Sequence, residues 1–306
     1  MARNARQQAV LLLGANGQLG HEAQRVLGCL GPLVALDVPN IDFTQPGSLR
    51  LLIRDLRPTI IVNAAAYTAV DKAESDAEIA WTVNALAPAI LAEEAAAVGA
   101  VLVHYSTDYV FDGTKIGAYT ETDTTAPLSV YGHTKLAGEV AVSRYARHLV
   151  FRTSWVVGAY GINFIKTILR LARERESLRV VADQYGAPTA ATLLAETTAN
   201  VLAQIRGVPE NDRRWGLYHL VASGETTWHG LARHVVTRAH AAGIRLRCGV
   251  DAIEAIPSSD YPTPAKRPIN SRLDTSKLQS TFGLKMPDWH EGVDSMLDRV
   301  FRELAA

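Results

Sequence analysis

Cysteine is scarce in this sequence. The 306 residues include only two cysteines, Cys29 and Cys248. Two thiols are too few for a disulfide framework, so the sequence favours a protein of a reducing compartment, the cytoplasm. An excess of one charge is also absent, because 31 Lys and Arg residues balance 31 Asp and Glu residues. We therefore expect neither nucleic acid nor an anionic membrane surface as a partner.

The sequence also lacks a long hydrophobic run. No stretch approaches the roughly 18 apolar residues that a membrane helix needs. The N-terminal segment MARNARQQAVLLLGANG carries two arginines and a short apolar run, which ends at Gly14 without a small-residue cleavage site. We therefore expect no signal peptide and no membrane-spanning helix.

Two common catalytic patterns are missing as well. The nine histidines form no H-E-x-x-H pair and no Cys/His spacing typical of zinc ligands. A G-x-S-x-G segment, which marks the nucleophile of many serine hydrolases, does not occur. Zinc chemistry and serine hydrolysis are therefore not supported, and the chemistry must come from other residues.

Apolar residues are plentiful, at 48% of the chain, and their pattern predicts an α/β fold. Short apolar runs predict strands at 9–14, 33–37, 59–65, 100–107 and 148–155. Amphipathic segments predict helices between them at 18–29, 47–56, 75–98 and 130–146. Nearly continuous apolar strands that alternate with helices indicate a Rossmann-like, doubly wound parallel sheet.

The pattern becomes less regular past Trp155. A helix is predicted at 163–176, and a helix at 191–205 with a strand at 216–222 is predicted to return to the first sheet. A further helix at 228–242 precedes a proline-rich stretch. We predict a dinucleotide-binding domain formed by 1–158 and 188–222, and a smaller C-terminal α/β substrate domain formed by 159–187 and 223–306.

A glycine-rich turn follows the first predicted strand. The segment LLLGANGQLG places Gly14, Gly17 and Gly20 where a strand gives way to a helix, which is the context of dinucleotide-binding turns. Asp37 ends the second predicted strand, where a carboxylate can hold ribose hydroxyls. A glycine turn without a ligand and a solvated carboxylate are the alternatives. Asp37 favours NADH over NADPH, because it would repel a 2′-phosphate unless a nearby cation compensates.

The segment SVYGHTKLAGE places Tyr131 and Lys135 four residues apart, on one face of a predicted helix. A free phenol has a pKa of about 10, and a neighbouring ammonium lowers it. Such a tuned acid is what carbonyl reduction needs. Thr107 and Asp108 end the preceding strand and complete a hydroxyl, phenol and ammonium set, although turn or capping roles would also explain them. His133 is expected to point away from this face.

Together these segments resemble the extended short-chain dehydrogenase/reductase superfamily, and within it most closely the dTDP-4-dehydrorhamnose reductases. The resemblance covers nearly the whole chain. It is carried by GANGQLG, VNAAAYTAVDKAE, HYSTDYVFDG, APLSVYGHTKLAGE, FRTSW, DQYGAPT, GLYHLVASG and YPTPAKRPINSRL. It implies that NADPH or NADH reduces the C4 keto group of a nucleotide sugar, dTDP-4-dehydro-β-L-rhamnose, to give dTDP-β-L-rhamnose.

The resemblance also implies roles for individual residues. Tyr131 would donate the proton, Lys135 would hold the cofactor ribose, and Thr107 would hydrogen-bond at the reacting oxygen. Asp108 and Trp155 match sugar contacts, and Arg267 would clamp the diphosphate. The other positions that match cofactor-binding residues are Gly14, Gly17, Gln18, Leu19, Gly20, Asp37, Asp42, Phe43, Ala66, Tyr67, Thr68 and Tyr105.

Some members of this superfamily dimerise around a magnesium ion held by glutamates. Glu22 matches one such position, but Thr192 occupies what corresponds to another. A Mg²⁺-bridged dimer is therefore not favoured here, whereas a homodimer formed by other contacts stays open.

Two classes of alternative to the reductase remain, a related enzyme of the same fold and a non-catalytic subunit. A nucleotide-sugar 4,6-dehydratase commonly carries a glutamate where this chain has Tyr109, and a 4-epimerase typically has Gly-Phe-Ile-Gly where this chain has Gly17-Gln18-Leu19-Gly20. A non-catalytic subunit that resembles the regulatory subunit of methionine adenosyltransferase would bind the cofactor without turnover. Intact Thr107, Tyr131 and Lys135 do not exclude that second alternative.

Overall fold

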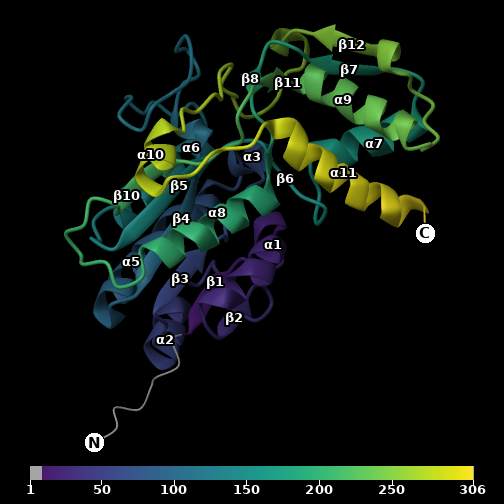
Figure 1. The fold of residues 1–306 in the computed structure, drawn as a ribbon. Helices are drawn as coiled ribbons and strands as arrows, with labels where there is room; N and C mark the ends of the chain where they lie inside the picture. Colours follow the sequence, from purple (N-terminus) through teal and green to yellow (C-terminus); the bar gives the residue numbers. More distant parts are fainter. Residues whose placement is uncertain (1–8, 306) are drawn as a thin grey trace, which may run out of the picture.

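A computed structural model describes residues 9–305, and its centre is a six-stranded parallel sheet (Figure 1). The strand order is β10-β5-β4-β3-β1-β2. The strands are β1 (Val10–Leu13), β2 (Leu33–Leu36), β3 (Ile60–Asn63), β4 (Val101–Thr107), β5 (His148–Thr153) and β10 (Gly216–His219). The predicted doubly wound parallel sheet is confirmed. The order of the strands reverses between β1 and β3, which is where such sheets bind their ligands.

The register brings the ends of β1 and β3 together. Leu13 pairs with Leu36 on one side and with Asn63 on the other, so the three strands end at the same level. All seven residues of β4 are buried, as expected for a strand covered on both faces. The loops after β1 and β3 therefore lie side by side at the carboxyl edge of the sheet.

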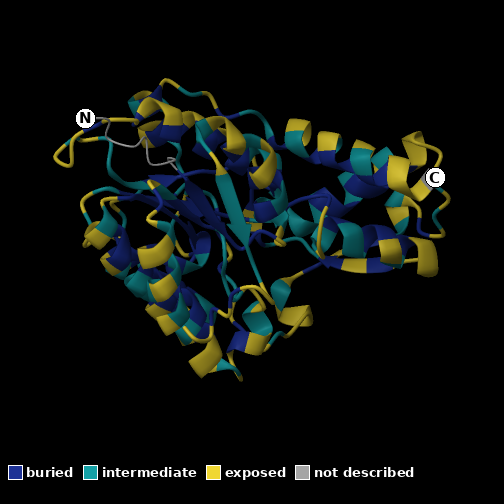
Figure 2. Cartoon of the chain, turned by 90° about the horizontal axis from the view of Figure 1, so that it is seen from below, coloured by how far each residue is buried: buried dark blue, intermediate teal, exposed yellow. Residues whose placement is uncertain are grey.

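Helices cover both faces of the sheet. One face carries α2 (Gly47–Leu56), α5 (Ala87–Val98) and α6 (Val130–Val142), and the other carries α1 (Gln18–Leu27) and α8 (Ala191–Gln204). Leu194 and Leu202 of α8 pack in one core with Val103 and Phe151 of the sheet. Figure 2 shows the buried strands between helices whose outer faces are exposed.

The prediction of one uninterrupted helix at 75–98 is wrong in detail. The structure has α3 (Val70–Ala73), α4 (Ala77–Trp81), a π-helical turn (Thr82–Leu86) and then α5. Asn84 lies in the middle of the wide turn and is 1% exposed. The side-chain amide of Asn84 forms hydrogen bonds with two other segments, which are described below. These tertiary contacts accompany the widening of the helix into a π-helical turn.

A second, smaller core lies beside the sheet (Figure 1). It is formed by α7 (Phe164–Glu174), α9 (Trp228–Ala241) and α11 (Trp289–Ala305), with the parallel pair β7 (Leu178–Val181) and β12 (Ile253–Ile256). Two further short strand pairings join β6 (Val156–Val157) to β9 (Thr189–Ala190), and β8 (Tyr185–Gly186) to β11 (Thr226–Thr227). Only the last of these is antiparallel. We call this part of the chain the substrate half.

The two-domain division predicted above stays a prediction. In the structure, helix α10 (Ser276–Phe282) packs its Leu278 and Phe282 against the core of the large sheet. The chain therefore crosses back to the large sheet near its C-terminal end before it forms α11. The remaining short elements are 3₁₀ turns at Gly28–Leu30, Asp108–Val110, Val250–Ala252 and Ser258–Asp260.

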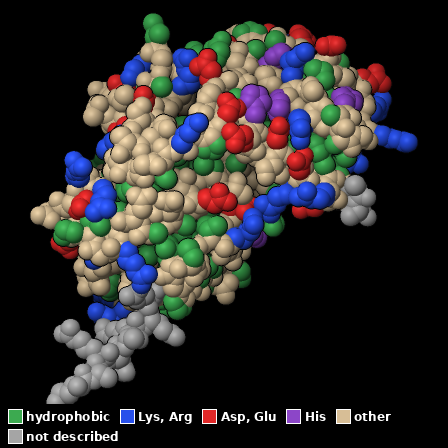
Figure 3. Space-filling model, viewed as in Figure 1, with side chains coloured by type: hydrophobic (Ala, Val, Ile, Leu, Met, Phe, Trp, Pro, Cys, Tyr) green, Lys and Arg blue, Asp and Glu red, His purple; other side chains and the backbone are tan. Residues whose placement is uncertain are grey.

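The surface agrees with the balanced charge of the sequence. Figure 3 shows Lys and Arg side chains interspersed with Asp and Glu on the face in view. Among the helices within residues 9–305, none is both long and apolar enough to cross a membrane. The expectation about a signal peptide rests partly on residues 1–8, which lie outside the described residues.

Candidate active site

The glycine turn after β1 is built by close backbone contacts. Gly14 has a positive φ of 84°, and a Cβ there would lie 2.5 Å from the Ala65 nitrogen. A Cβ on Gly20 would lie 2.0 Å from the Gly14 oxygen, so α1 rests directly on the turn. Gly17 differs, because its Cβ would meet only the Gly14 oxygen, at 3.4 Å. The protein's own packing therefore does not require glycine at position 17, because a side chain there would point into open space.

The N-terminus of α1 is open for an anion. Gly17 is the N-cap, no side chain caps the helix, and its first turn has no acidic residue. Unsatisfied N–H groups at a helix start bind phosphate oxygens, and the helix dipole favours the negative charge. This turn therefore fits the pyrophosphate of a dinucleotide. The Gln18 side chain points elsewhere and accepts a hydrogen bond from Asn163 Nδ2 at 2.8 Å, while Leu19 packs partly buried on the core.

Asp37 connects the turn to the end of β2. Its carboxylate accepts hydrogen bonds from the backbone N–H groups of Asn16 and Val38, both at 2.8 Å. A carboxylate has about four lone-pair sites, so two remain for ribose hydroxyls. The neighbouring Asp42 is engaged by Thr44, whose hydroxyl donates to it at 2.6 Å. The Phe43 side chain is 7% exposed and belongs to the core.

The loop after β3 is held by Asn84. The Tyr67 N–H donates to Asn84 Oδ1 at 2.9 Å, and Asn84 Nδ2 donates to the Tyr67 carbonyl and to the Thr134 hydroxyl, each at 3.1 Å. The loop with Ala66 and the exposed Thr68 is thereby tied to α6. Asn84 was not among the predicted site residues, because its helical context in the sequence gives no signal of this role.

Tyr131 lies in the first turn of α6, above the end of β4. Ser129 caps this helix by accepting from the Gly132 N–H at 3.2 Å. The Tyr131 ring packs edge-on against Tyr109, with 5.5 Å between the ring centroids. Thr107, at the end of β4, is 5% exposed and also acts on the phenol, since its hydroxyl lowers the Tyr131 pKa. The structure thus brings Thr107 and Tyr131 together as predicted.

The predicted lowering of the Tyr131 pKa is wrong for the protein alone. Burial raises the pKa of the phenol to about 12, the Thr107 hydroxyl opposes this rise, and the Asp108 carboxylate adds to it. The Lys135 ammonium is 3% exposed and donates to the Tyr105 carbonyl at 2.6 Å. Tyr131 is therefore a protonated phenol across the neutral range, and Lys135 follows one turn later on the same helix.

Tyr105 itself turns its side chain to the opposite face of the sheet. Its hydroxyl pairs with the Thr198 hydroxyl of α8 at 2.6 Å, and its ring lies in the core. Only its carbonyl faces Lys135. His133 is exposed, in agreement with the expectation that it points away from Tyr131.

Asp108 is a buried acid beside the phenol. It is 2% exposed, and the Thr107 hydroxyl donates to its Oδ1 at 3.1 Å. Burial raises the pKa of the Asp108 carboxyl to about 6, although the hydroxyls of Ser271 and Thr107 oppose the rise. An acid held in this state can both donate and accept hydrogen bonds near neutral pH.

Trp155 lies between β5 and β6 and contacts the substrate half. Its φ is 48°, an unusual value for a bulky residue. The predicted strand at 148–155 is therefore shorter in the structure, where β5 ends at Thr153. The indole stacks on Trp228, with 3.6 Å between centroids and 14° between planes. A Cβ on Gly186 would lie 2.8 Å from this indole, so glycine is required there. Trp228 was not among the predicted site residues.

Arg267 bridges the two halves of the chain. Its guanidinium donates to both carboxylate oxygens of Asp71, at 3.1 and 2.7 Å, and burial is only partial. Asp71 belongs to α3, in the segment that follows the loop after β3. The predicted diphosphate clamp is therefore held by a carboxylate in the protein alone.

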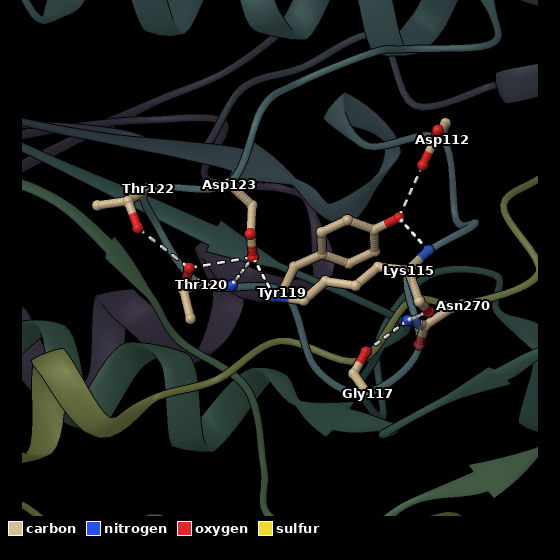
Figure 4. A network of polar contacts seen from close by, with 8 residues as sticks. All are labelled: Asp112, Lys115, Gly117, Tyr119, Thr120, Thr122, Asp123 and Asn270. Carbon is tan, nitrogen blue, oxygen red and sulfur yellow. Dashed lines mark hydrogen bonds and ion pairs between the residues drawn. The ribbon is translucent and has the colours of Figure 1, made fainter.

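The connection from Asp108 to α6 is anchored by a polar network (Figure 4). The Tyr119 hydroxyl donates to Asp112 at 2.8 Å, and Lys115 forms an ion pair with Asp123 at 2.5 Å. Asn270 Nδ2 donates to the carbonyls of Lys115 and Gly117 at 2.9 and 2.7 Å. The loop that leads into Tyr131 is therefore fastened to the same C-terminal segment that carries Arg267.

Comparison with known proteins decides the family. The family model described as RmlD substrate binding domain matches residues 8–302. The dTDP-4-dehydrorhamnose reductase of Escherichia coli K12 is 52% identical over 301 residues, which cover 97% of this chain and 99% of that protein. This chain belongs to the dTDP-4-dehydrorhamnose reductase family. Its resemblance to the extended short-chain dehydrogenase/reductases is thereby confirmed, and it is an NAD(P)H-dependent oxidoreductase.

Two crystal structures from this family share the fold. The dTDP-4-dehydrorhamnose reductase of Clostridium acetobutylicum has a TM-score of 0.87 at 34% identity and covers 95% of this chain and 99% of its own. The Bacillus anthracis protein, solved in complex with NADP, has a TM-score of 0.84 at 33% identity and covers 97% and 99%. The open glycine turn described above fits the same kind of cofactor.

The residues around Glu22 do not fit a magnesium ion. Glu22 is 2% exposed, and its two oxygens are paired with Arg25 at 2.8 Å and with Arg299 at 2.6 Å. Thr192 lines the same small cavity as Glu22 and Arg299 and adds no charge. Within the described part of the chain, no group of three or more His, Cys, Asp or Glu residues is arranged to hold a metal ion. The two guanidinium groups already neutralise the one carboxylate.

Proposed function

We propose that this protein reduces the C4 keto group of dTDP-4-dehydro-β-L-rhamnose to give dTDP-β-L-rhamnose, the last step of dTDP-L-rhamnose biosynthesis. The family supports the reductase activity. The observation that carries the proposal is the placement of Thr107, Tyr131 and Lys135 around one carboxyl edge of the sheet, beside an open dinucleotide turn.

The chain's residues would act on the carbonyl oxygen as follows. Bound NAD(P)H supplies the hydride. Tyr131 donates its phenolic proton to the C4 oxygen as negative charge develops there, and its raised pKa keeps that proton in place until then. The Thr107 hydroxyl hydrogen-bonds at the same oxygen. Lys135 carries a positive charge one helical turn from the phenol, and this charge would stabilise the phenolate that remains.

The remaining predicted residues would hold the nucleotide sugar. Trp155 offers an indole face beside the site, and Asp108 offers a carboxyl group for sugar hydroxyls. Arg267 would exchange its ion pair with Asp71 for the diphosphate, whose oxygens match the guanidinium fork. Gly17, Asp37, Asp42, Ala66, Tyr67 and Thr68, with the backbone of Gln18, Leu19, Phe43 and Tyr105, remain the proposed cofactor contacts.

We further propose that the protein works in a reducing cytoplasm as a homodimer that needs no bridging metal. Both cysteines are free thiols, and Cys29 is exposed. Sedimentation equilibrium in the presence of EDTA would test the assembly, since a monomer under these conditions would refute the metal-free dimer.

The experiment is a coupled assay that supplies the dTDP-4-keto sugar and follows NADPH and NADH oxidation separately. We expect many equivalents of cofactor to be oxidised per chain, whereas a regulatory subunit would only bind the cofactor. Tyr131→Phe should lower turnover by about 10²–10⁴-fold and leave cofactor affinity nearly unchanged. Tyr145→Phe, which removes a hydroxyl bonded to the Ala100 carbonyl away from the site, serves as the control. Near-normal turnover of Tyr131→Phe would refute the acid role.

A further inference from the structure

Helix α6 carries a buried stripe of three functional groups. Tyr131, Lys135 and Glu139 follow at intervals of four residues and therefore share one face of the helix. Lys135 is 3% exposed and Glu139 is 6% exposed. The stripe lies over the strand ends, so that the lysine has the phenol one turn before it and the carboxylate one turn after it.

Glu139 is gripped by an arginine from the sheet. Arg152, on β5, is 3% exposed, and its Nε donates to Glu139 Oε2 at 3.0 Å while Nη2 donates to Oε1. The guanidinium also lies over the Phe111 ring, 4.9 Å from its centroid. This bidentate ion pair fixes the position of the Glu139 carboxylate.

A buried ion pair of this kind is not explained by stability. Taking two charges out of water costs several kcal/mol per ion as an order of magnitude, and apolar residues of similar volume often serve the fold as well. Its electrostatic effect on a third group offers a better reason. That third group is Lys135, one helical turn away.

Asp108, beside Tyr131, is a second carboxylate of the site, but the effects that shift the Lys135 pKa are burial and Glu139, not Asp108. The remaining ionisable groups buried between α6 and the sheet supply no negative charge. His104 on β4 and His219 on β10 are fully buried, and burial lowers the pKa of both rings, so that both are neutral. Tyr131 is a protonated phenol, and Arg152 is positive. The carboxylate that raises the Lys135 pKa is that of Glu139.

We propose that Glu139, held by Arg152, is a positioning residue that keeps the ammonium group of Lys135 charged and directed into the active site. This inference rests on the role of Lys135 in the proposed function. Arg152 contributes by preventing Glu139 from turning toward the lysine and neutralising it in a direct ion pair. The Lys135 ammonium is thus left free to bond the Tyr105 carbonyl.

The need for such a group follows from the burial of the lysine. Burial lowers the pKa of Lys135 to about 8, even though Glu139 acts in the opposite direction. Without the carboxylate, the pKa would fall further, and a larger share of the amine would be neutral at physiological pH. A neutral amine would neither attract the cofactor ribose oxygens strongly nor stabilise a phenolate.

Three variants test this inference through the sign of their effects. Glu139→Gln leaves Arg152 unbalanced, so Lys135 should lose its proton at a pH lower by at least about one unit. Arg152→Met leaves Glu139 unbalanced, so the lysine should hold its proton to a higher pH. The double variant removes both charges and should show a smaller shift in the direction of Glu139→Gln, because Glu139, and not Arg152, is the charged group that shifts the Lys135 pKa.

The measurement is the pH dependence of NADPH affinity, followed by fluorescence, together with that of turnover. Glu94→Gln is the matched control, because Glu94 is also 2% exposed and paired with Arg50 and Arg54, but between α2 and α5. The alkaline limb is the pH range in which NADPH affinity and turnover fall as Lys135 loses its proton. We expect the alkaline limb of Glu94→Gln to match that of the parent protein. A folding defect common to buried glutamates would lower the melting temperature of both variants without moving the limb.

The inference is overturned if Glu139→Gln keeps the alkaline limb of the parent protein, or if Arg152→Met moves it in the same direction. If Glu139→Gln does not fold, the double variant decides in the same way, and an unmoved limb overturns the inference. The affinity readout needs no sugar substrate. If the parent protein did not turn over dTDP-4-dehydro-β-L-rhamnose, the proposed function would be refuted. The inference about Glu139 could still be tested through NADPH affinity.

Discussion

Replacing Gly20 by alanine tests the glycine turn by setting two effects against each other. The new Cβ would lie 2.0 Å from the Gly14 oxygen and 2.7 Å from the Ala15 Cα, which are backbone atoms that no rotamer change can move. Overpacking of this kind typically costs about 1–3 kcal/mol. Against this, alanine is favoured over glycine in a helix by about 0.5–1 kcal/mol. The clash is the larger effect.

We therefore expect Gly20→Ala to lose about 1–2 kcal/mol of stability, or about 2–4 °C in melting temperature for a chain of this size. The control lies at the other end of the same helix. Gly28 has a φ of −59°, and a Cβ there meets nothing within 4 Å. Gly28→Ala should raise the melting temperature by about 1–2 °C, because it restricts only the unfolded chain.

Thermal unfolding and an NADPH titration together provide the assay. The backbone must shift to admit the Gly20→Ala methyl group, and the shift moves the N–H groups at the start of α1, so NADPH affinity should fall at least about tenfold. Gly28→Ala should bind as the parent protein does. If Gly20→Ala melted and bound NADPH like the parent protein, the close contact between turn and helix would not be as described.

Three further outcomes follow from the site. Burial raises the Asp108 pKa to about 6, so the contribution of Asp108 to stability should become less favourable as pH rises from about 3.8 through about 6. Asp108→Asn should therefore raise the melting temperature more at about pH 7.5 than at about pH 4.5. Equal gains at both values would contradict that pKa. Removal of divalent ions with EDTA should leave turnover unchanged, because Arg25 and Arg299 already neutralise Glu22. Activity that is lost with EDTA and restored by Mg²⁺ would refute this prediction. Trp228→Leu should raise KM for the nucleotide sugar and abolish the exciton signal of stacked indoles in circular dichroism, with NADPH affinity unchanged. An unaltered KM would show that Trp155 needs no such support.

The order of strands and helices in the large sheet could be predicted because its signals are local. Apolar runs such as residues 9–14 and 100–107 can satisfy their backbone only in a covered sheet, and the glycine turn is written in one short segment. Thr107 and Tyr131 could be placed together for the same reason. Each belongs to a carboxyl-edge connection, and the topology of the sheet brings those connections together.

The direction of single side chains on a buried strand was less accessible. Every residue of β4 is buried, so polarity does not show which face is which. The sequence therefore does not reveal that the Tyr105 ring lies toward α8, although its neighbours in the sequence lie at the site. A strand with one wet face would have shown the alternation.

Contacts between distant segments were also beyond the sequence alone. The Glu139–Arg152 pair depends on how α6 lies over β5, and the stack of Trp155 on Trp228 depends on how the substrate half folds back. The π-helical turn around Asn84 differs from an α-helix by a slight widening, which the hydrophobic pattern does not record. These features are set by tertiary contacts, and a local pattern does not encode them.

The late return of the chain to the large sheet also limits how this protein can be divided. Helix α8 covers Val103 and Phe151, and β10 completes the sheet beside β5. A fragment that ended near residue 158 would expose this apolar face and an unpaired strand edge, and both promote aggregation. During synthesis on the ribosome the same surface stays uncovered until residues 191–219 have emerged. The cofactor-binding half is therefore not a module that can be cut from this chain, and exchanging sugar specificity by domain transplantation would require grafts at several separate points of the sequence.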